Sequence, residues 1–150
     1  MLPLNEFRQI VAGTPLVSID LVVEDSTGAF LLGLRENAPA QGYWFVPGGR
    51  ILKGEQIPQA FTRLVSNELG VAMNIDEAVF HGVYEHHYSD SFADPSVSTH
   101  YVVLAYKIQL NCEIQSLPVA QHSQYKWYSA AELLSDDSVH QHTKWYFENK

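Results

Sequence analysis

Apolar and polar residues alternate over several short stretches of the chain, a pattern typical of half-buried β-strands. The first stretch reads PLVSIDLVVE, and the turn residues Asp-Ser-Thr-Gly separate it from the second. Gly, Pro and Asn residues bound most of the others, as expected where strands end. The pattern predicts strands at residues 15–24, 29–34, 43–46, 79–88, 99–110 and 124–128.

Helical signals lie between and after these strands. Pro58 suits the first turn of a helix, and Gly70 suits its C-terminal stop. Ser129, with Glu132 three residues later, forms a capping box that begins a second helix. Residues 138–148 are predicted to form a closing helix. Mixed strands and helices in this order predict an α/β fold, in which helices flank a mixed sheet.

Composition narrows the class of protein. The chain has 150 residues, of which 46% are apolar and 12% aromatic, so we expect one globular domain over residues 1–150. A net charge of -8 disfavours binding to a nucleic-acid backbone. No stretch reaches the ~18 apolar residues of a membrane span, so no membrane association is expected. Cys112 is the single cysteine, which allows no internal disulfide and fits a reducing cytoplasm.

Arginines are few but concentrated. Arg35, Arg50 and Arg63 fall within 29 residues of one another, around the turn Pro47-Gly48-Gly49. Small residues in such a turn let the backbone approach a ligand closely, and the planar guanidinium suits phosphate oxygens. Any one of these arginines is equally well explained as a salt-bridge partner. Their concentration favours an anion site.

Residues 47–71, PGGRILKGEQIPQAFTRLVSNELGV, carry a spaced motif. Its matching positions are Gly49, Glu55, Arg63, Val65, Glu68, Gly70 and Val71. This spacing resembles the Nudix box, the signature of hydrolases that act on nucleoside diphosphates linked to another group. Two positions that carry Glu in the usual box are here Leu64 and Asn67. Helical residues three and four apart share a face, so positions 64, 67 and 68 form one cluster. Only Glu68 is anionic in this cluster, which suits one Mg²⁺ rather than several. The alternative is an ordinary amphipathic helix.

A narrower resemblance follows from the departures. The chain combines Leu64 and Asn67 at these positions with the segments TPLVSID, PAQGYWFVPGGR and THYVVL and with the pair Gln121-His122. In these features it resembles the GDP-mannose mannosyl hydrolases, a divergent Nudix branch. The likeness runs over nearly the whole chain and is weakest over the first dozen residues and over 108–120. It implies a Nudix fold, with a mixed β-sheet sandwiched between α-helices. It also implies hydrolysis of GDP-mannose, and of GDP-glucose, to GDP and free sugar, with water attacking the anomeric carbon and inverting it.

The resemblance further implies a ligand set and a base. The carbonyl oxygen of Gly48, the carboxylate of Glu68 and the amide oxygen of Gln121 would hold one Mg²⁺ per subunit. All three are hard oxygen donors, as Mg²⁺ prefers. His122 would be the general base, because imidazole titrates near neutrality. Glu55 belongs to the box but is expected to be structural or to support a site residue without contacting the substrate.

The remaining site residues are assigned to the substrate. Arg35 is expected at the diphosphate, Arg50 at the departing phosphate, and Arg63 either at the same charge or paired with Glu55. Asp20 and His86 are candidates for the sugar hydroxyls and for the positive charge that develops at the anomeric carbon. Asp20 lies in an otherwise apolar strand, where a buried carboxylate needs a partner or a function.

Apolar faces for the guanine would come from Tyr101 and Phe7, with Leu2 as a weaker candidate, although each is also explained as a core residue. The adjacent His86 and His87 cannot readily chelate one ion, because strand neighbours point to opposite faces. The resemblance suggests a homodimer. The rival functions are a conventional Nudix pyrophosphohydrolase that cleaves at phosphorus and a non-enzymatic sensor of nucleotide sugars.

Overall fold

The computed structural model describes residues 2–118 and 122–148, with the backbone alone at 122 and 123. Its strands are β1 (Leu16–Glu24), β2 (Phe30–Arg35), β3 (Trp44–Phe45), β4 (Gly48–Arg50), β5 (Val79–Tyr88), β6 (Thr99–Gln109) and β7 (His122–Tyr128). Its α-helices are α1 (Leu4–Gly13), α2 (Ile57–Leu69), α3 (Ala130–Ser135) and α4 (Gln141–Lys144). Short 3₁₀ turns are η1 (Ile75–Glu77), η2 (Ile114–Ser116) and η3 (Trp145–Phe147).

The strands form one mixed sheet whose main path is β3-β2-β1-β6-β5. β1 and β6 are parallel, and the other pairings are antiparallel. β1 and β2 pair only where their connecting turn begins, at Glu24 and Phe30. Farther along, β4 pairs with β1 while β3 and β7 pair with β2. The two central strands therefore diverge, and the segment that carries the glycine turn lies between them.

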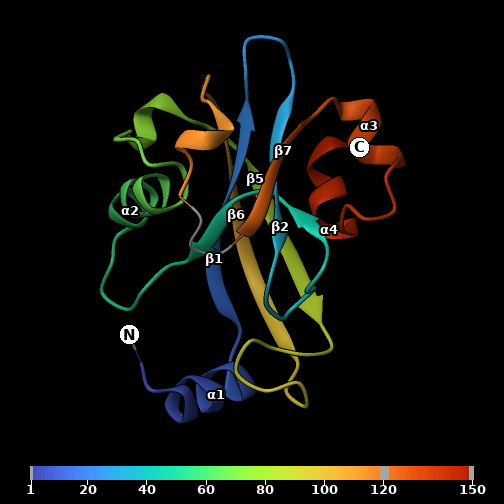
Figure 1. Cartoon of the computed structure of the whole chain (residues 1–150). Coiled ribbons are helices and arrows are strands. Elements are labelled where there is room, and N and C mark those ends of the chain that lie inside the picture. The colour runs from blue at the N-terminus through green and yellow to red at the C-terminus, as the bar shows by residue number, and fades with distance from the viewer. Residues whose placement is uncertain (1, 119–121, 149–150) are drawn as a thin grey trace.

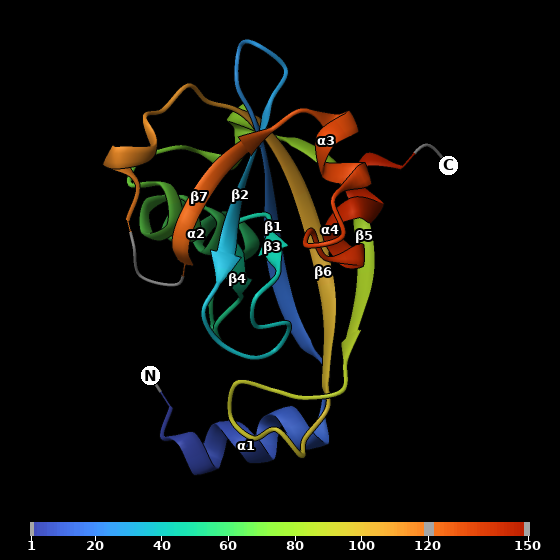
Figure 2. The same cartoon turned by 45° about the vertical axis from the view of Figure 1, so that its right-hand side comes forward.

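Helices cover both faces of this sheet, as Figures 1 and 2 show. On one face α2 packs Phe61, Leu64 and Val65 against Ile19 and Leu21 of β1. On the other face, α3 and the C-terminal segment pack against alternate residues of β1, β2 and β6; Val22, Leu32, Ala105, Leu133 and Tyr146 belong to this core. The predicted α/β sandwich is confirmed, and alternation along β1 decides which core each side chain enters.

The motif helix begins and ends where its sequence signals indicate. Pro58 lies in its first turn, and Gly70 adopts the left-handed conformation at its end, with φ of 72°. Glycine carries no Cβ penalty there, so the chain can turn away into the next segment.

Two parts of the chain differ from the sequence-based expectation. The predicted closing helix over 138–148 is shorter and divided, into α4 and η3, because Val139 forms a β-bridge with Trp44 and the His140 ring caps α4. The N-terminal residues, for which no element was predicted, form α1. This helix lies across the end of the sheet near the start of β6 (Figure 2). In the described part of the chain, no helix has the length and apolar character needed to cross a membrane.

Candidate active site

A cavity of about 720 Å³ opens between α1, the diverging strands and the segment 89–98. This volume falls in the range of small-molecule sites. Predicted site residues that line it are Leu2, Phe7, Asp20, Arg35, Gly48, Arg50, His86 and Tyr101. They come from elements far apart in the sequence, so the fold brings together residues that the resemblance assigned to one substrate.

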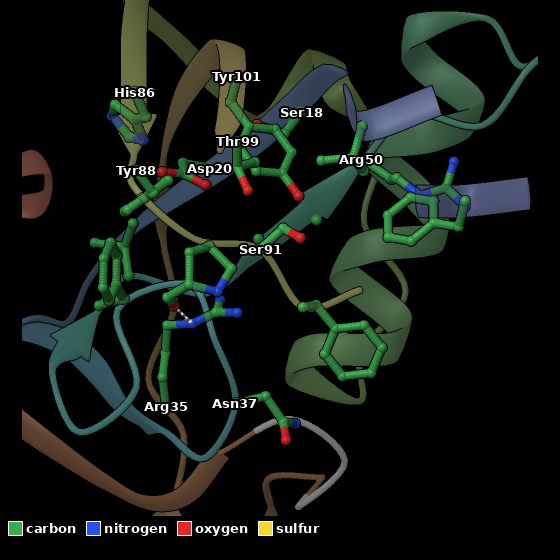
Figure 3. A pocket seen from close by; sticks show the side chains of 18 of the residues that line it. Ser18, Asp20, Arg35, Asn37, Arg50, His86, Tyr88, Ser91, Thr99 and Tyr101 are labelled. Carbon is green, nitrogen blue, oxygen red and sulfur yellow. Dashed lines mark hydrogen bonds between the residues drawn. The ribbon is translucent and has the colours of Figure 1, made fainter. Parts of the chain in front are cut away.

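Figure 3 shows how the polar side chains divide the cavity. Asp20, His86 and Tyr88 lie close to one another, with Thr99 and Tyr101 beside them. Arg35 and Arg50 stand on separate walls. The region around Asp20 therefore offers hydrogen-bonding groups and a carboxylate, and the two guanidinium groups add positive charge from two other sides of the cavity.

The predicted Mg²⁺-binding region is built on the register between β1 and β4. Gly48 pairs with Asp20, and the Gly48 N–H donates a hydrogen bond of 3.3 Å to Oε1 of Glu68 on α2. The Glu68 residue is only 3% exposed, so its carboxylate points into the protein beside the glycine turn. Leu64 is in the core and Asn67 is exposed. Of the three clustered helix positions, only Glu68 provides an anionic oxygen at this place, which fits one hard divalent cation.

The glycine turn is sterically confined. A Cβ on Gly48 would lie 2.5 Å from Oδ1 of Asp20 and 2.5 Å from the carbonyl oxygen of Ile19. A Cβ on Gly49 would lie 2.6 Å from the Leu64 side chain. Leu64, one of the departures from the usual box, therefore packs against the turn that it helps to position.

Replacing Gly48 by Ala is expected to lower the free energy of unfolding by about 1–3 kcal/mol, because β4 must move away from β1. Gly13→Ala is the matched control, since nothing lies within 4 Å of a Cβ there. Urea denaturation of both variants measures the difference. Equal midpoints would show that the turn tolerates a side chain.

A tyrosine links the acidic and imidazole groups of the cavity. The Tyr146 hydroxyl donates a hydrogen bond to Oδ2 of Asp20 and lies 3.2 Å from Nε2 of His86. Since the hydroxyl has one proton, Nε2 of His86 must donate to the Tyr146 oxygen in this arrangement. Tyr146 thus joins the C-terminal segment to β1 and β5 and fixes both predicted sugar-binding side chains.

Burial sets the charge states of these groups. It raises the pKa of Asp20 to about 7, although the Tyr146 hydrogen bond and Arg35 favour the ionised form. Burial, together with the smaller effects of the neighbouring His142 and His140, lowers the pKa of His86 to about 3. His86 is therefore neutral at physiological pH and serves as a hydrogen-bonding group, whereas Asp20 changes charge near neutrality.

The three arginines have different surroundings. The Nε of Arg35 donates to the Pro39 carbonyl at 3.0 Å, which leaves the rest of its guanidinium in the cavity. The Arg50 guanidinium lies over the Phe7 ring, 4.8 Å from its centroid. Arg63 is paired with Glu55 at 2.7 Å and 2.9 Å and also donates to the Arg50 carbonyl. Of the two alternatives for Arg63, the structure shows the ion pair with Glu55, and Arg63 does not line the cavity.

Two predicted residues lie wholly or partly outside the described residues. Gln121 lies outside the described residues, and so does the side chain of His122. The His122 backbone pairs with Arg35, a residue of the cavity wall. The strand that follows Gln121 therefore begins next to the cavity.

Sequence reasoning missed several residues of the cavity. Tyr88 follows His86 by two positions, so strand alternation alone could have placed it on the same face. Ser91 and Phe92 come from the polar segment after β5. Tyr146, which contacts Asp20 without lining the cavity, had no usable signal, because this contact spans 126 residues.

Comparisons with known proteins agree with this architecture. A family model described as NUDIX domain matches residues 14–148. The chain is 42% identical over 125 residues to the low-salt glycan biosynthesis protein Agl8 of Haloferax volcanii, covering 83% of this chain and 78% of that protein.

Solved structures show the same fold. The MutT protein from Methanosarcina mazei aligns with a TM-score of 0.72 at 19% identity, over 90% of this chain and 92% of that one. A MutT NUDIX hydrolase from Burkholderia pseudomallei aligns with a TM-score of 0.71 at 22% identity, over 89% of this chain and 96% of that one. Together with the family model, which spans most of the sequence, these findings show that the chain belongs to the Nudix hydrolase family.

Proposed function

We propose that this Nudix hydrolase converts GDP-mannose, and also GDP-glucose, to GDP and the free sugar in a Mg²⁺-dependent reaction. Nudix enzymes generally act on small molecules with the help of a divalent metal ion. In the proposed reaction, water attacks the anomeric carbon with inversion and leaves the diphosphate intact.

One observation carries this proposal: the motif helix presents a single carboxylate, Glu68, to the glycine turn, while Leu64 is in the core. Substitution at phosphorus by a usual Nudix enzyme draws on several metal ions, which need several carboxylates. When an intact diphosphate departs, fewer metal ions are needed, because one cation and nearby guanidinium groups can stabilise the negative charge of the diphosphate. Arg35 and Arg50 line the cavity, which supports this assignment.

The residues of the chain divide the reaction between them. When bound, Mg²⁺ would stabilise negative charge on the diphosphate; Gly48, Glu68 and Gln121 are the proposed ligands. Arg35 binds the diphosphate and Arg50 the departing phosphate. His86 and Asp20 contact the sugar, and ionised Asp20 stabilises the positive charge at the anomeric carbon. His122 takes a proton from the attacking water.

The guanine would lie against apolar surfaces at the α1 side of the cavity. Leu2 and Phe7 line this part within the same chain, and Tyr101 adds an aromatic ring from β6. Because the Phe7 ring already supports the Arg50 guanidinium, α1 would connect base recognition with phosphate binding.

Separation of the products tests the proposal. The protein is incubated with GDP-mannose and Mg²⁺, and the nucleotides are resolved by chromatography. GDP with free mannose is the expected result. GMP with mannose 1-phosphate would establish a conventional pyrophosphohydrolase instead, and binding without turnover would establish a sensor.

Glu68→Gln is expected to raise the Mg²⁺ concentration for half-maximal activity on the order of 10- to 100-fold, a range found even when groups that only support a metal ligand are changed. Glu55→Gln is the control within the same motif, because Glu55 pairs with Arg63. It should lower stability and leave the metal dependence nearly unchanged. Identical metal dependence in Glu68→Gln and the unaltered protein would remove Glu68 as a ligand.

The cellular setting is proposed by analogy. The relative from Haloferax volcanii is named for glycan biosynthesis, a process that consumes activated sugars. Hydrolysis of a nucleotide sugar would control the supply of such a donor. We place the protein in the cytoplasm as a homodimer, with the small-molecule nucleotide sugar as its substrate.

A further inference from the structure

Three potential metal ligands meet on the face of the sheet opposite the cavity. Glu85 and His87 are two positions apart on β5, so they share a face, and His100 lies directly across from His87 on β6. The intervening His86 and the next residue, Tyr88, point to the cavity instead. The sheet therefore separates the cluster from the cavity residues His86 and Tyr88.

The three side chains are close enough to share one ion. Each offers one ligand atom, and these atoms all lie within 4.8 Å of one another. The two imidazole rings are stacked, with centroids 4.2 Å apart and planes 25° apart. Nε2 of His87 lies 3.6 Å from Oε2 of Glu85, which is too long for a strong hydrogen bond.

One nitrogen of the cluster lacks a partner within the described ranges. Nε2 of His100 is buried and makes no hydrogen bond there. A buried polar atom left unsatisfied destabilises the fold by about 1–3 kcal/mol. A cation that binds imidazole nitrogens and a carboxylate oxygen suits this set of side chains.

We propose that Glu85, His87 and His100 bind one divalent transition-metal ion, with Zn²⁺ as the best match. Two imidazole nitrogens and one carboxylate, completed by water, form a common tetrahedral zinc set. Mg²⁺ prefers oxygen donors, so it does not compete effectively here. Glu85 and His87 are exposed, which gives the ion access from solvent.

The bound ion would fasten the end of β5 to the start of β6. These two ends flank the segment 89–98, whose Ser91 and Phe92 line the cavity on the other side. Zinc at this position would therefore fix the two ends of segment 89–98, which forms part of the cavity wall. The inference concerns metal binding alone and stands whether or not the proposed hydrolase activity is correct.

Calorimetric titration with Zn²⁺, in saturating Mg²⁺ to fill the oxygen-rich site, tests the proposal. The full chain should bind one more equivalent than the double variant His87→Ala/His100→Ala. Glu85→Gln should weaken this site on the order of 10-fold. Glu6→Gln, which removes an exposed carboxylate from α1, is the matched control and should bind as the unaltered protein does.

Histidine ring resonances of the unaltered protein provide a second test, which does not depend on a variant folding. The first equivalent of Zn²⁺ should shift the His87 and His100 signals and leave those of His140 and His142 in place. Unchanged stoichiometry in the double variant, or a first equivalent that shifts other histidines instead, would overturn the proposal.

Discussion

Replacing His122 by Gln is expected to lower turnover on the order of 10²- to 10⁴-fold, the range for loss of a general base. Gln keeps a polar side chain of similar length and cannot accept a proton from water at neutral pH. The affinity for GDP-mannose should change little, because the base acts on water and leaves the phosphates and guanine in contact with other residues. Single-turnover rates and calorimetric binding measure the two effects separately.

Chemical rescue distinguishes a base from a structural histidine. His122→Ala should regain part of its activity when imidazole is added, since the small molecule can occupy the vacated space and accept the proton. The β7 backbone pairs with Arg35, so a purely structural role would instead appear as weaker substrate binding. Full turnover in His122→Gln would remove this residue from the mechanism.

Asp20→Asn is expected to lower turnover on the order of 10²-fold and to stabilise the folded chain. The loss of activity follows because neutral Asn cannot stabilise positive charge at the anomeric carbon. Asn can still accept the hydrogen bond from Tyr146, so the change isolates the charge. Steady-state kinetics at saturating GDP-mannose measure the first effect.

The gain in stability has a defined pH dependence. Asp20 in the folded chain keeps its proton up to a pKa of about 7, whereas the unfolded chain releases it near the ordinary value of 3.8. The folded state therefore binds more protons between these values, and the contribution of Asp20 to stability falls as pH rises through this window. Above pH 7 the variant should be more stable on the order of 2–4 kcal/mol, and near pH 4 the two proteins should agree.

Urea denaturation without added Mg²⁺, from pH 4 to pH 8, measures this difference. Comparing variant with parent cancels the opposing contribution of His86, whose lowered pKa makes the fold less stable as pH falls. Tyr146→Phe is the matched variant: it removes the hydroxyl that donates to Asp20 and keeps the carboxylate. A constant stability difference across the range would contradict the raised pKa of Asp20.

Local signals in the sequence predicted most of the elements. Strand alternation placed β1, β5 and β6 to within a residue or two, and the Pro58 and Gly70 signals bounded α2. The predictions were incomplete where tertiary contacts decide the backbone. The bridge between Val139 and Trp44 shortens the closing helix, and the glycine turn forms β4 because β1 lies beside it.

The residues of the candidate site, like the elements of the fold, were predicted only in part. The motif and the family resemblance identified Asp20, Arg35 and Arg50, and the fold places all three in one cavity. Spacing alone could not decide between two partners for Arg63, since that choice depends on how the loop carrying Glu55 folds back onto α2. Nor could it find Tyr146, which reaches Asp20 from the opposite end of the chain.

Hydrolysis in ¹⁸O-labelled water tests the central claim most directly, because the labelled atom marks the atom that water attacked. GDP-mannose is turned over with Mg²⁺, the products are separated, and the ¹⁸O content of each is measured by mass spectrometry. Attack at the anomeric carbon predicts heavy oxygen in the free mannose and none in the GDP. Label in a phosphate of either product would contradict the account.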